Sequence, residues 1–145
     1  MLDLFQSPGR YIMRIASGLV HKLDSFVENT GITPVEARVL QFIAAADSPL
    51  YQKDIEAEYG YTAATVSELI KGMEAKGLIV REVDAEDRRR RRLTIAPGIT
   101  QQVSHMREQM IQMESDLVRG IDGESLEVFM RVARKMSENM PPRSK

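Results

Sequence analysis

The chain has 145 residues, of which 43% are hydrophobic and 28% charged, with a formal net charge of −1. This length and composition suit one compact domain and exclude a disordered chain. The sequence contains no cysteine and two histidines. These counts exclude disulfides, thiol nucleophiles and cysteine-based zinc sites, and they argue against a histidine-rich metal centre, so we expect no metal and no cofactor.

Hydropathy and motif content narrow the functional classes further. No stretch approaches the roughly 18 consecutive apolar residues that a membrane span needs, so we expect no membrane partner. The start of the chain lacks a basic segment followed by an apolar run, which predicts no secretory signal and hence a cytoplasmic location. We recognise no nucleophile–base pair, phosphate-cradling glycine loop or metal cluster, and we therefore do not expect an enzyme.

The first third of the chain predicts two helices with recognisable ends. Apolar residues at three-and-four spacing predict a helix from Arg10 to about Asn29. The segment Thr33-Pro34-Val35-Glu36 has a capping threonine, a proline at the first helical position and a glutamate that completes a capping box. This segment predicts a second helix, which runs to about Ala46.

Two further helices follow in close succession. The first lies within Leu50–Gly60 and ends at a glycine suited to the left-handed conformation. The second is capped by Thr62 and runs to about Lys76. Two helices joined by a short segment containing glycine are typical of a helix-turn-helix.

The hydrophobic period then changes to that of strands. Leu78–Val83 and Arg90–Ile95 flank a polar turn and predict a β-hairpin, in the position of a wing. Strand alternation sends neighbouring arginines to opposite faces, with Arg88, Arg90 and Arg92 on one side and Arg89 and Arg91 on the other.

The last third of the chain predicts a long helix and a shorter one. The long helix spans about Thr100 to Arg119, and the last begins at Asp122-Gly123-Glu124. A heptad-like seam of apolar residues along the long helix suits a partner helix. We predict a dimer interface from this seam and two flanking positions, namely Leu19, Val103, Met106, Met110, Met113, Leu117 and Phe129. Core packing and the lining of a ligand pocket are the alternatives for the methionines.

The helix that begins after Thr62 has an apolar face and a face of small or hydroxylated residues. The second face suits close approach to the floor of a DNA major groove. The residues predicted to contact DNA are Thr62, Ala63, Ala64, Thr65, Ser67, Glu68 and Lys71. The alternative is that the alanines and threonines serve only capping and helix propensity.

Five consecutive arginines, Arg88–Arg92, lie on the predicted hairpin. Their mutual repulsion costs stability and the fold does not require them, so we favour DNA phosphate contact by Arg88, Arg89 and Arg90 over a solvated charge run. Pairing with an acid on the opposite strand is the alternative role for Arg92.

Two aspartates near the hairpin tip, Asp84 and Asp87, are predicted to organise the wing. A carboxylate there accepts hydrogen bonds from turn amides or holds an arginine side chain in place. Plain turn propensity is the alternative, because aspartate favours turns.

These segments together resemble the MarR family of winged-helix transcriptional regulators. The resemblance is most specific at Gln52–Gly60, Thr65-Val66, Met73–Ile79 and Asp84–Arg89. It implies a mainly α fold with a small β-hairpin wing (α+β), in one domain over residues 1–145. Residues 33–98 form the winged helix-turn-helix lobe, and helices within 10–30 and 99–140 form a dimerisation lobe.

The resemblance also implies a function. It implies a homodimer that binds a pseudo-palindromic site in double-stranded DNA, usually as a repressor. It often implies release by a small phenolic or anionic effector bound between the lobes, for which Tyr11, Arg14 and Arg38 are the candidate residues. The alternative is a winged-helix protein-interaction module without DNA binding, against which the arginine-rich wing argues.

Overall fold

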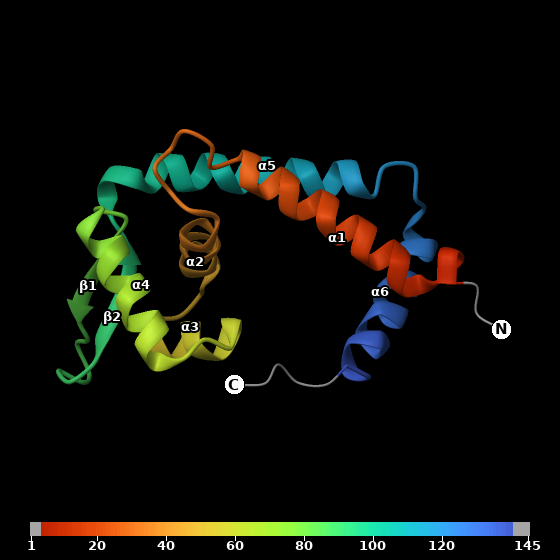
Figure 1. The fold of residues 1–145 in the computed structure, drawn as a ribbon. Helices are drawn as coiled ribbons and strands as arrows, with labels where there is room; N and C mark the ends of the chain where they lie inside the picture. Colours follow the sequence, from red (N-terminus) through yellow and green to blue (C-terminus); the bar gives the residue numbers. More distant parts are fainter. Residues whose placement is uncertain (1–3, 141–145) are drawn as a thin grey trace.

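The computed structural model describes residues 4–140 and has a winged-helix lobe at one end and two outlying helices at the other (Figure 1). A long helix, α5, connects the two regions along one side of the molecule. In chain order the elements are η1 (Leu4–Gln6), α1 (Pro8–Ser25), α2 (Pro34–Ala45), α3 (Gln52–Tyr59), α4 (Ala63–Ala75), β1 (Ile79–Val83), β2 (Arg91–Ile95), η2 (Pro97–Ile99), α5 (Thr100–Leu117) and α6 (Gly123–Glu138).

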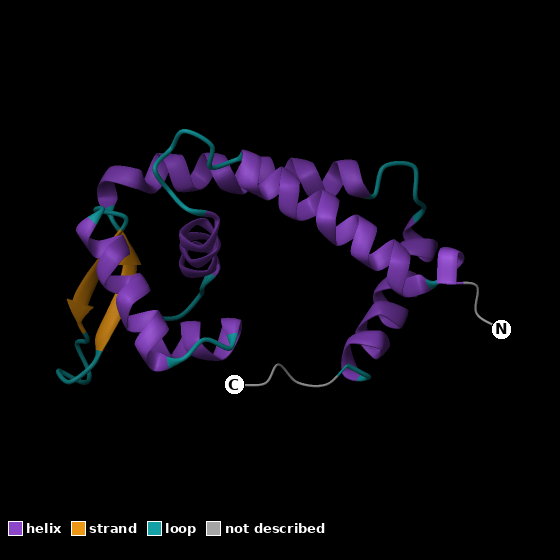
Figure 2. Cartoon of the chain, viewed as in Figure 1, coloured by secondary structure: helices purple, strands orange, loops and turns teal. Residues whose placement is uncertain are grey.

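The hairpin is the only strand pair among residues 4–140, and helices make up most of the remaining chain (Figure 2). This arrangement confirms the predicted fold class, mainly α with a small β-hairpin. No helix in the described part of the chain is both long enough and apolar enough to cross a membrane.

Three of the predicted helix starts are present with their capping hydrogen bonds. Thr33 and Glu36 form the reciprocal capping box at the start of α2, and the distance from Thr33 N to Glu36 Oε2 is 2.8 Å. Thr62 and Asp122 each accept from the backbone N–H three residues further on, at the starts of α4 and α6. Gly60 ends α3 in the left-handed conformation with φ +66°.

The first helix differs from its predicted bounds at both ends. Ser7 accepts from the N–H of Arg10 and places Pro8 at the first helical position, so α1 begins two residues early. It ends at Ser25 rather than near Asn29, and a turn in which Asn29 adopts a left-handed φ of +61° then leads to α2. Apolar spacing alone did not predict this turn.

The predicted alternation of the arginines along a strand is wrong for Arg88, Arg89 and Arg90. Strand β2 begins at Arg91 and pairs antiparallel with β1, with Val83 opposite Arg91 and Ile79 opposite Ile95. Arg88, Arg89 and Arg90 therefore lie in the loop at the wing tip, where strand alternation does not apply. On the other edge of β2, Leu50 forms an isolated antiparallel bridge with Leu93.

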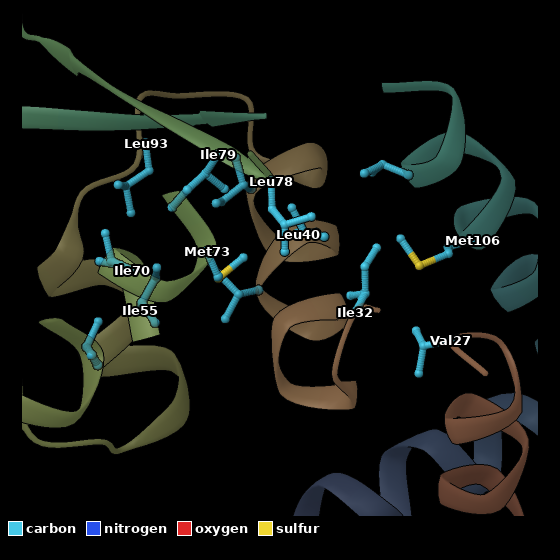
Figure 3. Packing of buried hydrophobic residues seen from close by; sticks show 14 residues of the cluster. Val27, Ile32, Leu40, Ile55, Ile70, Met73, Leu78, Ile79, Leu93 and Met106 are labelled. Carbon is cyan, nitrogen blue, oxygen red and sulfur yellow. The ribbon is translucent and has the colours of Figure 1, made fainter. Parts of the chain in front are cut away.

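One hydrophobic core holds α2, α3, α4 and α5 against the hairpin (Figure 3). The predicted apolar face of α4 is inside, with Val66, Ile70 and Met73 buried and Leu69 half-buried. Leu93 from β2 and Ile79 from β1 belong to the same cluster. Because protein cores are close-packed, this cluster holds α4 and the hairpin base as one rigid unit.

The predicted apolar seam lies on α5, and part of it is buried within the single chain. Val103 and Met106 belong to the core of the single chain, and Met113 is buried as well. Met110 is half-buried and Leu117 is exposed. The buried part of the seam therefore fulfils the alternative prediction, core packing, and cannot face a partner without the chain opening.

Candidate nucleic-acid interface

The start of α4 presents most of the predicted DNA-contacting residues to solvent. Thr62, Ala63, Ala64, Thr65, Glu68 and Lys71 are exposed, and Ser67 is half-buried. Thr62 Oγ1 accepts from Thr65 N at 3.2 Å and lies 2.9 Å from Thr65 Oγ1. Glu68 and Lys71 pair at 2.9 Å. Both ions of this pair are well exposed, so it is weakly held and open to exchange for other partners.

Two aspartates fold the wing tip, residues 84–90, around their carboxylates. Asp84 Oδ1 accepts from the backbone N–H of Glu86 at 2.7 Å and of Asp87 at 2.9 Å. Asp87 Oδ1 accepts from the N–H of Arg89 at 2.9 Å. The N–H of Asp84 donates to the carbonyl of Arg90 at 3.1 Å and closes the loop. These are the amide contacts expected of the two side chains.

Asp84 is buried although it is charged. The hydrogen bond from the Tyr51 hydroxyl, followed by those from the two backbone amides, lowers its pKa from 3.8 to about 2. Carboxylates that accept several hydrogen bonds remain ionised for this reason. The wing tip therefore contains a permanent anion at neutral pH, fully used in internal hydrogen bonds.

The five arginines have different partners in the structure. Arg92 pairs with Glu82 across the hairpin at 2.6 Å, the alternative named for it from the sequence. Arg91 donates to the carbonyl of Arg88 at 3.0 Å, and Arg90 lies over the ring of Tyr51. The guanidinium groups of Arg88 and Arg89 have no hydrogen bond or ion pair within residues 4–140. They are therefore the two arginines best placed to bind an external anion.

The wing tip and the start of α4 both adjoin the start of α3. The Tyr51 side chain contacts the wing through Asp84 and Arg90. Its neighbour Gln52 donates from Nε2 to the carbonyl of Ala63, the first residue of α4, at 3.2 Å. The wing tip and the start of α4 thus lie at the same end of the lobe, as the ribbon in Figure 1 also shows.

A mostly apolar cavity lies between α1, α2 and α5. It has a volume of about 200 Å³, and Arg38 of α2 and Asp24 of α1 are its charged lining residues. Arg38 is one of the three residues predicted to bind an effector. Tyr11 and Arg14 are exposed on α1 and do not line this cavity. No group of three metal-ligating side chains occurs among residues 4–140.

Comparison with known proteins finds a family model that matches part of the chain. The sequence model of the MarR family matches residues 30–90, which span α2 to the wing tip. Over this segment the chain is similar to the MarR family.

Solved structures of transcription regulators superpose over nearly the whole chain. The DNA complex of MepR from Staphylococcus aureus is 26% identical, has a TM-score of 0.83 and covers 96% of this chain and 100% of its own. MepR in its DNA-binding conformation is 28% identical, with a TM-score of 0.80 and coverage of 93% and 100%. MarR from Oenococcus oeni shares the fold at 19% identity and a TM-score of 0.77, with coverage of 92% and 100%. No match was found among curated proteins.

Sequence reasoning missed two contacts in this chain. One is the contact of Tyr51 with the wing. The other is the ion pair of Lys76 with the buried Glu36 at 2.9 Å, which ties the end of α4 to the start of α2. A local signal existed only for Tyr51, because an aromatic residue at an N-cap position departs from the usual choice of serine, threonine or aspartate.

Proposed function

We propose that the chain is a sequence-specific regulator that binds double-stranded DNA, and that it acts as a dimeric repressor at a pseudo-palindromic operator. The observation that carries this proposal is the juxtaposition of two unpaired arginines on a folded wing tip with the exposed, small-residue start of α4. The solved DNA complex of MepR, 26% identical over nearly the whole chain, supports it.

The proposed contacts divide between affinity and specificity. Arg88 and Arg89 supply sequence-independent affinity through phosphates or a minor groove, because their charges are not neutralised within the protein. Ala63, Ala64 and Thr65 offer methyl groups that fit thymine methyls in the major groove, and Glu68 suits a cytosine amino group. Arg90 contributes to this surface while it remains stacked on Tyr51.

A homodimer is supported by the apolar faces of α1 and α6. Neither helix buries any residue within the described chain. Their exposed apolar side chains are Tyr11, Ile12, Met13, Ile15, Val20, Val128, Phe129, Met130 and Val132. Helices of this length are marginal in water without tertiary packing, so a partner of matching apolar character is needed. A second copy meets this need and would present two wings and two α4 helices to a two-fold symmetric site.

An effector is supported by the cavity between α1, α2 and α5. Its walls are mainly apolar, with Arg38 as the cation that would meet an acidic group. A small aromatic anion fits this combination. Benzoate is a simple probe: release of bound DNA by benzoate in the wild type, but not in Arg38→Ala, is the expected result.

The first experiment is a titration of purified protein against DNA from its own upstream region, beside random DNA, at two salt concentrations. We expect selective and salt-sensitive binding. Weak binding that is indifferent to sequence would contradict the sequence-specific part of the proposal. No binding even at low salt would overturn it and favour a protein-interaction module.

A further inference from the structure

The residue before α3 has an unusual side chain for its position. Serine, threonine, aspartate and asparagine are preferred there because their side-chain oxygens accept from the free N–H groups of the first turn. Tyr51 makes no such side-chain hydrogen bond. The start of α3 is instead held by Asp54, whose Oδ2 accepts from the N–H of Tyr51 at 2.7 Å. The tyrosine side chain is therefore free for contacts outside the helix.

That side chain contacts both ends of the wing tip. The Tyr51 hydroxyl donates to Asp84 Oδ2, at the end of β1. The guanidinium carbon of Arg90, just before β2, lies 3.5 Å from the centroid of the Tyr51 ring. A cation over an aromatic face is attracted by the ring quadrupole. The Tyr51 side chain thus contacts Asp84, where the loop begins, and Arg90, where it ends.

Asp84 transmits this contact to the rest of the loop. Its Oδ1 accepts the amides of Glu86 and Asp87, while its Oδ2 accepts the Tyr51 hydroxyl. The carboxylate raises the pKa of Tyr51 above 10.0, so the hydroxyl stays protonated and continues to donate through the physiological range. The loop that carries Arg88 and Arg89 is therefore built on an acid whose position Tyr51 fixes.

The same end of α3 also contacts α4. Gln52 Nε2 donates to the carbonyl of Ala63 and to Glu56 Oε1, at 3.2 and 2.9 Å. Ile55, one turn further along α3, is fully buried in the core. Adjacent residues of a rigid helix thus contact the wing on one side and the start of α4 on the other.

We propose that Tyr51 is a positioning residue, which anchors the wing tip to the helix-turn-helix and sets Arg88 and Arg89 relative to the start of α4. The inference rests on the proposed DNA-binding function and assigns within it a residue that the sequence did not suggest. A two-stranded ribbon alone is marginally stable, so a free wing would lose conformational entropy on binding. An anchored wing has already lost that freedom.

The first test measures the free protein. Tyr51→Phe removes only the hydroxyl, and Tyr51→Leu also removes the ring beneath Arg90. Hydrogen exchange at the amides of Glu86 and Asp87, followed by NMR, should accelerate by about three- to tenfold in Tyr51→Phe, the equivalent of one net hydrogen bond, and further in Tyr51→Leu. Unchanged exchange in both variants would overturn the anchoring role.

A matched control removes another tyrosine hydroxyl from the same helix. Tyr59 donates to the carbonyl of Arg38 at 3.1 Å and contacts no residue of the wing tip. Tyr59→Phe should leave exchange at Glu86 and Asp87 as in the wild type. Acceleration equal to that of Tyr51→Phe would show general loosening of the lobe, and would also overturn the proposal.

The second test measures DNA binding. Tyr51→Phe should weaken the affinity several-fold while the slope of log K against log salt stays unchanged, because no phosphate contact is removed. Asp84→Asn should weaken the affinity at least as much, because it also alters the acceptor of the Glu86 and Asp87 amides. The double variant should lose little more than Asp84→Asn alone, since the Tyr51 hydroxyl acts through the Asp84 carboxylate. Wild-type affinity in Tyr51→Phe and Tyr51→Leu would overturn the positioning role. If the wild type itself bound no DNA, the proposed function would fail, while amide exchange would still decide the anchoring.

Discussion

Single side chains on the hairpin decide how much positive charge is available to the proposed DNA ligand. Arg92 is neutralised by Glu82, whereas Arg88 has no counter-ion within residues 4–140. Both residues carry the same charge and lie four positions apart on one hairpin. Their local partners, rather than the number of arginines, should therefore determine their contributions to binding.

Arg88→Ala should weaken binding to all DNA sequences and reduce the slope of log K against log salt by about one. Arg92→Ala removes the same charge from an arginine that is already paired, and it is the matched control. Its salt slope should remain close to that of the wild type. Fluorescence anisotropy at four salt concentrations measures both slopes, and equal changes in the two variants would contradict the assignment of free and paired arginines.

Asp84 gives the wing a defined dependence on pH. Its folded-state pKa of about 2 lies below the ordinary value of 3.8. A lowered carboxyl pKa contributes stability that is fully present above the unfolded value and is lost as pH falls through the folded value. We expect the stability advantage of the wild type over Asp84→Asn to be constant above about pH 5 and to shrink from about pH 4 towards 2.

Urea unfolding at a series of pH values tests this expectation. Asp47→Asn, in the exposed loop after α2, is a control of the same chemical type. It should change stability little at any pH. An advantage of the wild type over Asp84→Asn that persists undiminished as pH falls to 3 and below would contradict the role of the ionised carboxylate.

At the scale of elements, contacts that lie far apart in sequence fix the helices to one another. Lys76, at the end of α4, donates to both carboxylate oxygens of Glu36 and to the carbonyl of Gly31 at 3.2 Å. Burial by itself raises the pKa of Glu36, but the hydrogen bond from Thr33 and the ammonium of Lys76 outweigh it, and the pKa is lowered. Glu36 therefore serves as a helix cap and as an ion-pair partner at once.

Glu36→Ala should lower the free energy of unfolding by about 1–2 kcal/mol, because it removes the reciprocal cap and the ion pair together. Glu36→Gln keeps the capping hydrogen bond and should cost about half as much. Glu138→Gln breaks an exposed pair with Lys135 and should cost at most about 0.5 kcal/mol. Urea denaturation ranks the three, and equal losses would show that the position of Glu36 has no special role.

The elements that could be predicted from the sequence are those whose causes are local. The caps at Thr33, Thr62 and Asp122 depend on residues three positions apart, and all three are present. The contact of Tyr51 with Asp84 spans 33 positions and depends on how the hairpin packs against α3. Strand β2 begins at Arg91, one residue later than predicted, and Arg90 therefore lies in the loop rather than in the strand. Local patterns predict elements well, but not the contacts between them.

At the scale of the whole molecule, the single chain leaves two helices without a covered apolar face. Met13 on α1 is 71% exposed and Phe129 on α6 is 52% exposed. Full burial of each such side chain would stabilise an association of two chains by about 1.5–3 kcal/mol, so a few of them are enough to hold the chains together. The seam predicted from the sequence is less suitable for a test, because a charge at the buried Met113 would unfold the chain itself.

Met13→Glu combined with Phe129→Glu should dissociate the proposed dimer. Light scattering should give twice the chain mass of 16.4 kDa for the wild type and the single-chain mass for the variant. Val83→Glu introduces the same charge at an exposed position on β1, far from α1 and α6, and should remain dimeric. The dissociated variant should keep the part of the helical circular dichroism that the winged-helix lobe contributes. It should lose most of its affinity for a two-site operator, because one chain engages only one half-site. A dimer that persists in the double variant would show that the two chains meet through another surface.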